Sequence, residues 1–185
     1  MDLSDCRRII VFGGTFDPPT MAHVVQPTHV MEAIDADAVA YVPAAVSPFK
    51  VDKDTTPAEH RVAMLRLVID VIDHAVVLTD ELDRAADGQP SFTVDTLEAL
   101  RARLPDTTEM RLLIGSDQLK MFDRWKDHDR IIELAEPIVM LRPPDSRATL
   151  LDALPPDFDR GVWAKRLVDA PAADVGTGLV RDLDR

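Results

Sequence analysis

The sequence is poor in cysteine, in basic residues relative to acidic ones, and in long hydrophobic runs. Its one cysteine, Cys6, rules out an internal disulfide and a cysteine-based zinc site. The 21 basic and 33 acidic side chains give a formal net charge of -12, which argues against a nucleic-acid partner because phosphate backbones require basic surface. No run approaches the roughly 18 apolar residues of a membrane span, and no signal-peptide pattern occurs. We therefore expect a cytoplasmic protein with no membrane association.

What is present is an ordinary globular composition, with 46% hydrophobic and 29% charged residues in a chain of 185. This length suits one domain with a full core. We expect residues 1–185 to form a single domain, with 143–160 as a mobile surface segment and 161–185 as a short C-terminal part. The acidity does not exclude a nucleotide substrate, because a small anion needs only a local cluster of donors.

Short apolar runs alternate with amphipathic stretches along the chain. Runs of β-branched residues predict strands, and apolar residues three or four positions apart predict helices. This alternation predicts an α/β fold, a doubly wound parallel sheet of Rossmann-like type with helices on both faces. Residues 85–90 and 142–160 are predicted to be loops. The expected strands are 9–12, 38–42, 75–78, 110–114, 138–141 and 163–168, and the expected helices are 24–34, 57–72 and 93–104, with another helix starting at 115–117.

Residues 13–23 follow the first predicted strand, where doubly wound sheets bind their ligands. Gly13 and Gly14 let the backbone turn sharply and let an anion approach main-chain N–H groups. The helix that begins near residues 20–23 points its positive end at the same anion. Thr20 and His23 are expected on one side, nearly one turn apart. The segment predicts a phosphate site; the alternative is a plain connection with an exposed histidine.

The segment GGTFDPPTMAH resembles the signature of adenylyltransferases that make NAD precursors and coenzyme A, Gly-Gly/Ser-Thr/Ser-Phe-Asp-Pro followed by His/Thr-x-Gly-His. Further blocks follow in that family's order: SPFK at 47–50, HRVAML at 60–65, ELDR and SFTVDTL within 81–97, and LIGSDQL with Phe and Trp within 113–125. Together they resemble bacterial nicotinate mononucleotide adenylyltransferases. The resemblance implies a nucleotidyltransferase fold and transfer of AMP from ATP to nicotinate mononucleotide, which gives deamido-NAD and pyrophosphate in NAD biosynthesis.

The resemblance also implies roles for individual residues. The implied catalytic residues are His23, Thr20 and Lys50, the last as a flexible point charge on a phosphate. The implied ATP-binding residues are Gly13, Gly14, Thr15, Phe16, Gly115, Asp117, Thr177 and Arg181, and the implied acceptor-binding residues are Phe92, Thr93 and Trp125. Mg²⁺ is expected only as the ion that ATP carries, with no dedicated metal cage in the protein. The state of assembly stays open, a homo-oligomer included.

Several of these residues also have a purely structural interpretation. Thr93 and Asp117 suit helix caps, Trp125 suits a core residue, and Lys50 suits the surface. Other motif residues are predicted to be structural: Glu81 and Arg84 as an ion pair, and His60 and Arg61 at a helix start.

Besides Phe92 in place of tyrosine, two departures from the family pattern concern the nucleotide site. Ala22 stands where the signature has glycine, so its methyl group is expected beside the nucleotide. Residues 175–181 read VGTGLVR where the family has Ile-Ser-Ser-Thr-x-Ile-Arg. Two alternatives therefore stay open. One is a nucleotide-binding relative without turnover, and the other is an adenylyltransferase for nicotinamide mononucleotide or another phosphorylated acceptor.

Overall fold

The structure, a computed structural model, describes residues 1–45, 55–84 and 91–169 of the chain. Within them lies one six-stranded sheet in the order β3-β2-β1-β4-β5-β6, with every neighbouring pair parallel. This order reverses between β1 and β4, where doubly wound sheets open a crevice for ligands. The strands are β1 (Arg8–Gly14), β2 (Ala38–Pro43), β3 (Ala75–Val77), β4 (Glu109–Gly115), β5 (Glu136–Leu141) and β6 (Leu167–Asp169).

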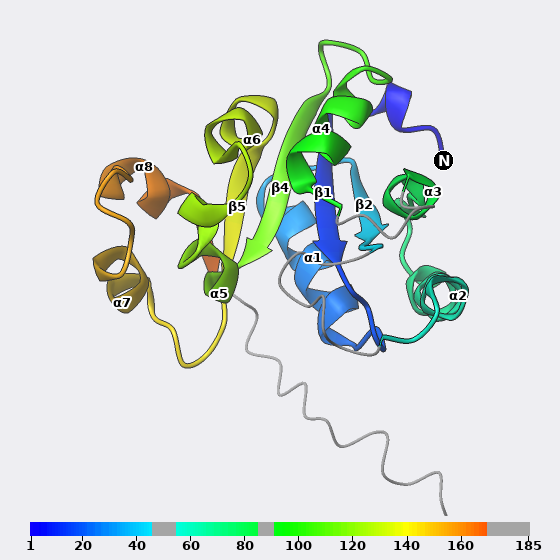
Figure 1. Ribbon diagram of the computed structural model, residues 1–185, viewed down its shortest axis with the longest axis horizontal. Helices are drawn as coiled ribbons and strands as arrows, with labels where there is room; N and C mark the ends of the chain where they lie inside the picture. Colours follow the sequence, from blue (N-terminus) through cyan, green and yellow to red (C-terminus); the bar gives the residue numbers. More distant parts are fainter. Residues whose placement is uncertain (46–54, 85–90, 170–185) are drawn as a thin grey trace, which may run out of the picture.

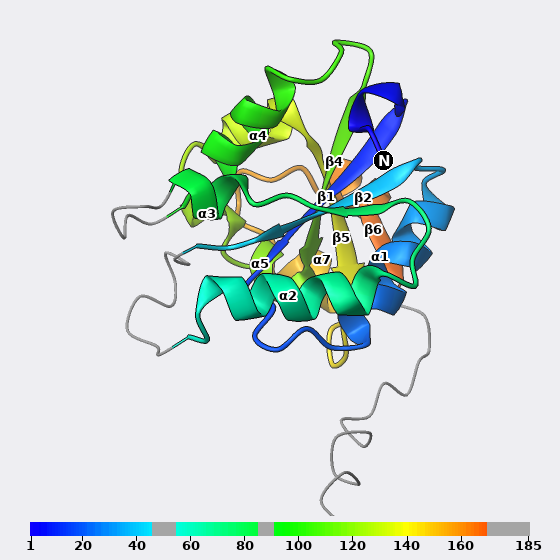
Figure 2. The same cartoon turned by 90° about the vertical axis from the view of Figure 1, so that its right-hand side faces the viewer.

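Helices cover both faces of this sheet, as Figures 1 and 2 show. Helices α1 and α2 lie on one face, whereas α4 and α6 lie on the other. The predicted α/β architecture is therefore confirmed. The helices are α1 (Ala22–Ala33), α2 (Ala58–Ile69), α3 (Asp80–Arg84), α4 (Thr93–Arg101), α5 (Ser116–Leu119), α6 (His128–Leu134), α7 (Arg147–Asp152) and α8 (Arg160–Lys165), with 3-10 turns η1 (Leu3–Asp5) and η2 (Phe122–Arg124).

Each face of the sheet has its own hydrophobic core, because successive strand residues point to opposite sides. In β1, Ile9 and Val11 pack with α4 and α6, while Ile10 and Phe12 pack with α1 and α2. Both faces of the central strands are buried, which explains their continuous apolar runs. No helix among the described residues combines the length and apolar character that crossing a bilayer requires.

A row of alternating charges joins the amino ends of four strands, and we call it the charge ladder. It consists of Arg8, Glu109, Arg111, Glu136 and Arg166, from β1, β4, β5 and the residue before β6. Glu109 Oε2 lies 2.8 Å from Arg8 Nε and 2.9 Å from Arg111 Nη2. Glu136 lies 3.3 Å from Arg111 and 3.5 Å from Arg166. The ladder links strands that are far apart in the sequence.

Two expectations for the C-terminal third are wrong. The strand predicted at 163–168 begins only at Leu167, because Trp163 lies in α8, whose start is capped by the Asp159 carboxylate on the Val162 N–H at 2.8 Å. The loop predicted at 142–160 contains α7, which begins with a capping box between Ser146 and Thr149 and buries Leu150. The loop predicted at 85–90 lies outside the described residues.

Candidate active site

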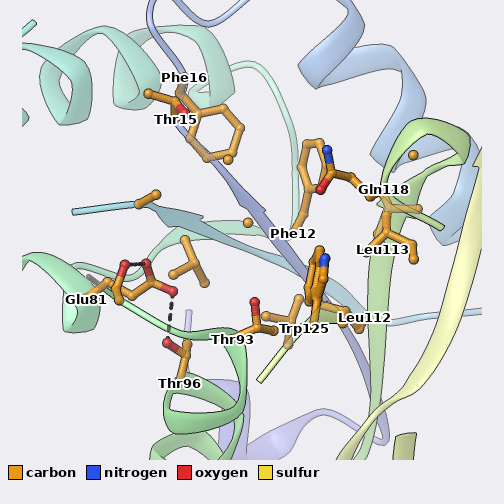
Figure 3. Close-up of a pocket in the computed structure, with 18 of the residues that line it drawn as sticks. Phe12, Thr15, Phe16, Glu81, Thr93, Thr96, Leu112, Leu113, Gln118 and Trp125 are labelled. Atoms are coloured by element: carbon orange, nitrogen blue, oxygen red, sulfur yellow. Dashed lines mark hydrogen bonds between the residues drawn. The ribbon is translucent and has the colours of Figure 1, made fainter. Parts of the chain in front are cut away.

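A pocket of about 690 Å³ opens at the carboxyl ends of β1 and β4, the place where the strand order reverses. Its walls come from the segments that follow the strands and from the start of α4 (Figure 3). The polar or glycine positions that line it include Gly13, Gly14, Thr15, Asp17, His23, Glu81, Ser91, Thr93, Thr96, Gly115, Asp117, Gln118, Arg124, Lys126 and Arg142. Ligand binding at this edge was the expectation for such a sheet.

The loop after β1 holds a tight turn. Phe16 has a φ of 50° and a side chain only 2% exposed, so its ring folds back into the core. A Cβ at Gly14 would meet that ring at 3.0 Å, so the buried ring would have to shift to admit any other residue here. The buried Arg61 guanidinium donates to the Thr15 carbonyl at 2.7 Å and to the Thr56 carbonyl at 3.0 Å. Arg61 thus has the structural role expected of it, since it fixes the path of this loop.

His23 is held in one orientation by Thr20. The Thr20 backbone N–H donates to His23 Nδ1 at 2.8 Å, and the Thr20 hydroxyl lies 3.0 Å from the same atom. Because a backbone N–H can only donate, Nδ1 accepts and the neutral ring carries its proton on Nε2. Burial, and then the positive charge of Arg142, lower the pKa of His23. The ring is therefore kept as a neutral Nε2–H donor in the wall of the pocket.

Arg142 is a pocket cation that the sequence analysis missed. It directly follows β5, and its Nη1 lies 3.9 Å from Asp117 Oδ1. Its Nε is buried and has no hydrogen-bond partner within the described parts of the chain. From the sequence, residue 142 is predicted only to follow a strand and begin a loop. Their position after a parallel strand, like that of Gly13 and Gly115, was the signal that could have identified Arg142.

The predicted acceptor residues also line the pocket, and Figure 3 shows Thr93 and Trp125 on the same side of it. Thr93 begins α4, whose N-cap residue Phe92 makes no side-chain capping bond, so N–H groups of the first turn are available to a ligand. Trp125 is half-buried against Phe122, with ring centroids 5.2 Å apart. Its Nε1 is a buried donor without a partner among the residues described. Trp125 therefore belongs both to the core surface and to the pocket.

A buried hydrogen-bond network supports that wall. Glu81 accepts from the Ser91 hydroxyl at 2.5 Å and from the Thr96 hydroxyl at 2.9 Å (Figure 3). Arg84 donates to the Thr96 hydroxyl at 2.7 Å. The ion pair predicted between Glu81 and Arg84 is wrong as a direct contact, because the Thr96 hydroxyl connects them. The network ties α3 to the first turn of α4.

Most of the predicted site residues within the described parts of the chain meet in this pocket. Thr20 instead contacts His23 and is not in the pocket wall. Ala22, whose methyl group is expected beside the nucleotide, begins α1 and is not in the pocket wall either. Lys50, Thr177 and Arg181 lie outside the described residues. The predicted residues that line the pocket are Gly13, Gly14, Thr15, Phe16, His23, Phe92, Thr93, Gly115, Asp117 and Trp125.

Comparisons with known proteins agree with this geometry. Residues 11–181 match the model of the family described as cytidylyltransferase-like. The "Probable nicotinate-nucleotide adenylyltransferase" of Gemmatimonas aurantiaca is 35% identical over 181 residues, covering 95% of this chain and 82% of that protein. The protein of the same name from Chromobacterium violaceum is 34% identical over 176 residues, covering 95% and 79%.

A solved structure supports the fold. The Plasmodium falciparum nicotinic acid mononucleotide adenylyltransferase complexed with NaAD superposes with a TM-score of 0.62, covering 90% of this chain and 76% of that chain at 20% identity. At that identity the likeness speaks for the fold alone. The sequence relatives carry the assignment further: the chain belongs to the cytidylyltransferase-like family and, within it, to the nicotinate-nucleotide adenylyltransferases.

Proposed function

We propose that this pocket transfers AMP from ATP to nicotinate mononucleotide. An oxygen of the acceptor phosphate attacks the α-phosphorus of ATP in line. A new phosphorus–oxygen bond forms, the bond between the α-phosphorus and its bridging oxygen breaks, and pyrophosphate leaves. The acceptor phosphate is already ionised, so the step needs no strong general base. Catalysis then consists of positioning and of stabilising negative charge.

The observation that carries this proposal is the neutral, oriented His23 in a pocket lined by glycines and Arg142. Its Nε2–H donates to a phosphate oxygen on which charge develops in the transition state. Backbone N–H groups of residues 14–16 add donors where Gly14 lets the chain come close. Arg142 adds a positive charge to the pocket wall, where its guanidinium attracts an anionic oxygen. Thr20 acts through His23 by fixing its tautomer.

The acceptor wall favours an acid over an amide. The open first turn of α4 offers N–H groups and the positive end of the helix dipole, both of which attract a carboxylate. Lys126 Nζ lies 4.9 Å from the centre of the Phe92 ring, and its charge is paired with Asp95 at 2.9 Å, so the helix start rather than Lys126 carries this preference. Trp125 presents a half-buried aromatic surface on which a pyridine ring can stack.

Mg²⁺ enters this proposal as part of the substrate, bound to the triphosphate. It offsets charge on the phosphates in a chain whose own net charge is -12. Lys50, Thr177 and Arg181 stay predicted phosphate ligands, and a cytoplasmic location stays a prediction.

The direct test is pyrophosphate release from MgATP with three acceptors: nicotinate mononucleotide, nicotinamide mononucleotide and none. We expect the acid to be turned over at least tenfold faster than the amide, because only the acid bears a full charge at the start of α4. Faster release with the amide would reassign the acceptor. ATP binding by calorimetry without release on either acceptor would identify a nucleotide-binding relative without turnover.

A further inference from the structure

Helix α1 contains a proline one turn beyond His23. Pro27 is buried within this helix. In a regular helix, the N–H of residue 27 would donate to the carbonyl of residue 23. Proline has no N–H, and its ring pushes that carbonyl outward. The main chain of His23 therefore lacks the donor that its position in the helix would normally supply.

A tyrosine hydroxyl donates a hydrogen bond to the His23 carbonyl in place of the missing N–H. Tyr41 Oη donates to the His23 carbonyl oxygen at 2.9 Å, across the sequence from β2 to α1. The Tyr41 side chain is completely buried, where a hydroxyl needs a partner. Burial also raises the pKa of Tyr41, so the phenol stays protonated and able to donate. One residue further along, the Thr28 hydroxyl likewise donates to the Val24 carbonyl, at 2.9 Å.

His23 is thus fixed at two points that lie on different elements. Thr20 holds the ring through Nδ1, and Tyr41 holds the main chain through the carbonyl. The rings of Phe12 and Phe16 fill the space between, with centroids 6.2 Å and 5.2 Å from the His23 ring and 5.8 Å and 6.0 Å from the Tyr41 ring. A small movement of the main chain at His23 would move its ring away from the substrate phosphate to which it donates.

We propose that Tyr41 is a positioning residue for adenylyl transfer, its hydroxyl replacing the helical N–H that Pro27 lacks at the catalytic histidine. This inference rests on the proposed role of His23. Tyr41 itself touches no substrate. It determines where the Nε2–H of His23 stands when the transition state forms.

The test is a double-mutant cycle with Tyr41→Phe and Pro27→Ala. Tyr41→Phe keeps the buried ring and removes only the hydroxyl. Because the loosened histidine is displaced mainly in the transition state, we expect kcat to fall about tenfold while KM for ATP changes less than about twofold. Pro27→Ala restores the helical N–H, so alone it is expected to turn over within about twofold of the wild type. In the double variant, the new N–H bonds the free carbonyl and kcat returns to within about threefold of the Pro27→Ala value.

The matched control is Thr28→Val, which removes the neighbouring hydroxyl-to-carbonyl bond in the same helix and is expected to leave kcat unchanged. A second readout, independent of turnover, is the titration of the His23 ring followed by NMR. We expect its chemical shifts to move in Tyr41→Phe and to return in the double variant. Circular dichroism and thermal melts check that each variant is folded.

The outcomes separate this inference from the function on which it rests. Wild-type kcat and unmoved His23 resonances in Tyr41→Phe would overturn the inference, as would a double variant no faster than Tyr41→Phe. A Pro27→Ala variant as slow as Tyr41→Phe would also overturn it, because the helix bend rather than the missing donor would then matter. Undiminished turnover in His23→Ala would instead refute the proposed role of His23.

Discussion

The two ends of the parallel sheet contrast sharply in how their charged groups are used. At the amino ends, the charge ladder pairs Arg8, Arg111 and Arg166 with two glutamates. At the carboxyl ends, Arg142 lies in the pocket wall, and its nearest carboxylate oxygen in an ion pair is 3.9 Å away. The sheet therefore pairs its charges closely at one end and keeps a more loosely paired cation beside the pocket at the other.

The largest expected effect comes from His23→Ala at the carboxyl end. Loss of one preorganised donor to a developing charge lowers kcat by about 10²- to 10³-fold. The measurement is steady-state pyrophosphate release, with a thermal melt of the same sample. If activity and the amount of folded protein fell equally, His23 would contribute to stability rather than to catalysis, and the contrast between the two ends of the sheet would not hold.

A matched pair of arginine variants tests the contrast directly. We expect Arg142→Met to lower kcat/KM for ATP about 10- to 100-fold, the value of a hydrogen bond to a charged group, with little change in Tm. Arg166→Met removes the same charge from the amino end, and it is expected to lower Tm while leaving kcat/KM unchanged. Reversed results, with activity lost in Arg166→Met and retained in Arg142→Met, would break the comparison.

Whether an interaction could be predicted from the sequence depends on whether its residues lie close together in the chain. The turn at Gly13 and Gly14 and the contact between Thr20 and His23 lie within eleven residues, so spacing predicted them. Arg142 reaches the pocket because β5 pairs with β4. Its place after a predicted strand points to this edge of the sheet, but it does not show which strand lies beside β5.

The C-terminal third shows a second reason why the sequence alone does not predict the whole structure. Trp163 sits in a short apolar run that suits a strand or a helix equally well, and the Asp159 cap and packing against Phe158 decide the matter. Tyr41 lies in the strand predicted at 38–42, but its bond to His23 requires β2 and α1 to be placed in space. Tertiary contacts, not local preference, determine these details.

A smaller effect is expected from Glu109→Gln, which neutralises the centre of the charge ladder. Because Glu109 is about half exposed, solvent screening limits the loss of unfolding free energy to about 1 kcal/mol, or about 2–4 °C in Tm. Turnover should stay at the wild-type value. A thermal melt and a parallel assay check both points; a variant with unchanged Tm and reduced turnover would contradict this assignment.

The pH dependence of Glu109 gives that variant a further control. The hydrogen bond from Arg8 lowers the pKa of Glu109 below its ordinary value of 4.5. Its contribution to stability is therefore fully present above pH 4.5 and is lost as the pH falls through the lower, folded-state pKa. The wild type and Glu109→Gln should approach each other in Tm below that pH.

The smallest expected effect is a shift in a titration. Burial, and to a lesser extent Arg142, lower the pKa of His23 from its ordinary value of 6.5. The free protein should therefore show a midpoint below 6.5, and unfolding, which lets the ring take up a proton, becomes easier as the pH falls below 6.5. In Arg142→Met the midpoint should rise but stay below 6.5, because burial remains. NMR titration measures both; a midpoint above 6.5 in the wild type would contradict the neutral donor.

The contrast between the two ends is tested most directly by amide-resolved NMR of the 20.5 kDa chain titrated with MgATP and then with nicotinate mononucleotide. The account predicts that resonances of Gly13, Gly14 and Gly115 shift with MgATP and that Thr93 shifts with the acceptor, while Glu109 at the amino end stays in place. Two results would contradict this prediction. One is shifts that cluster on the charge ladder, and the other is unshifted resonances at the carboxyl ends of the strands in enzymatically active protein.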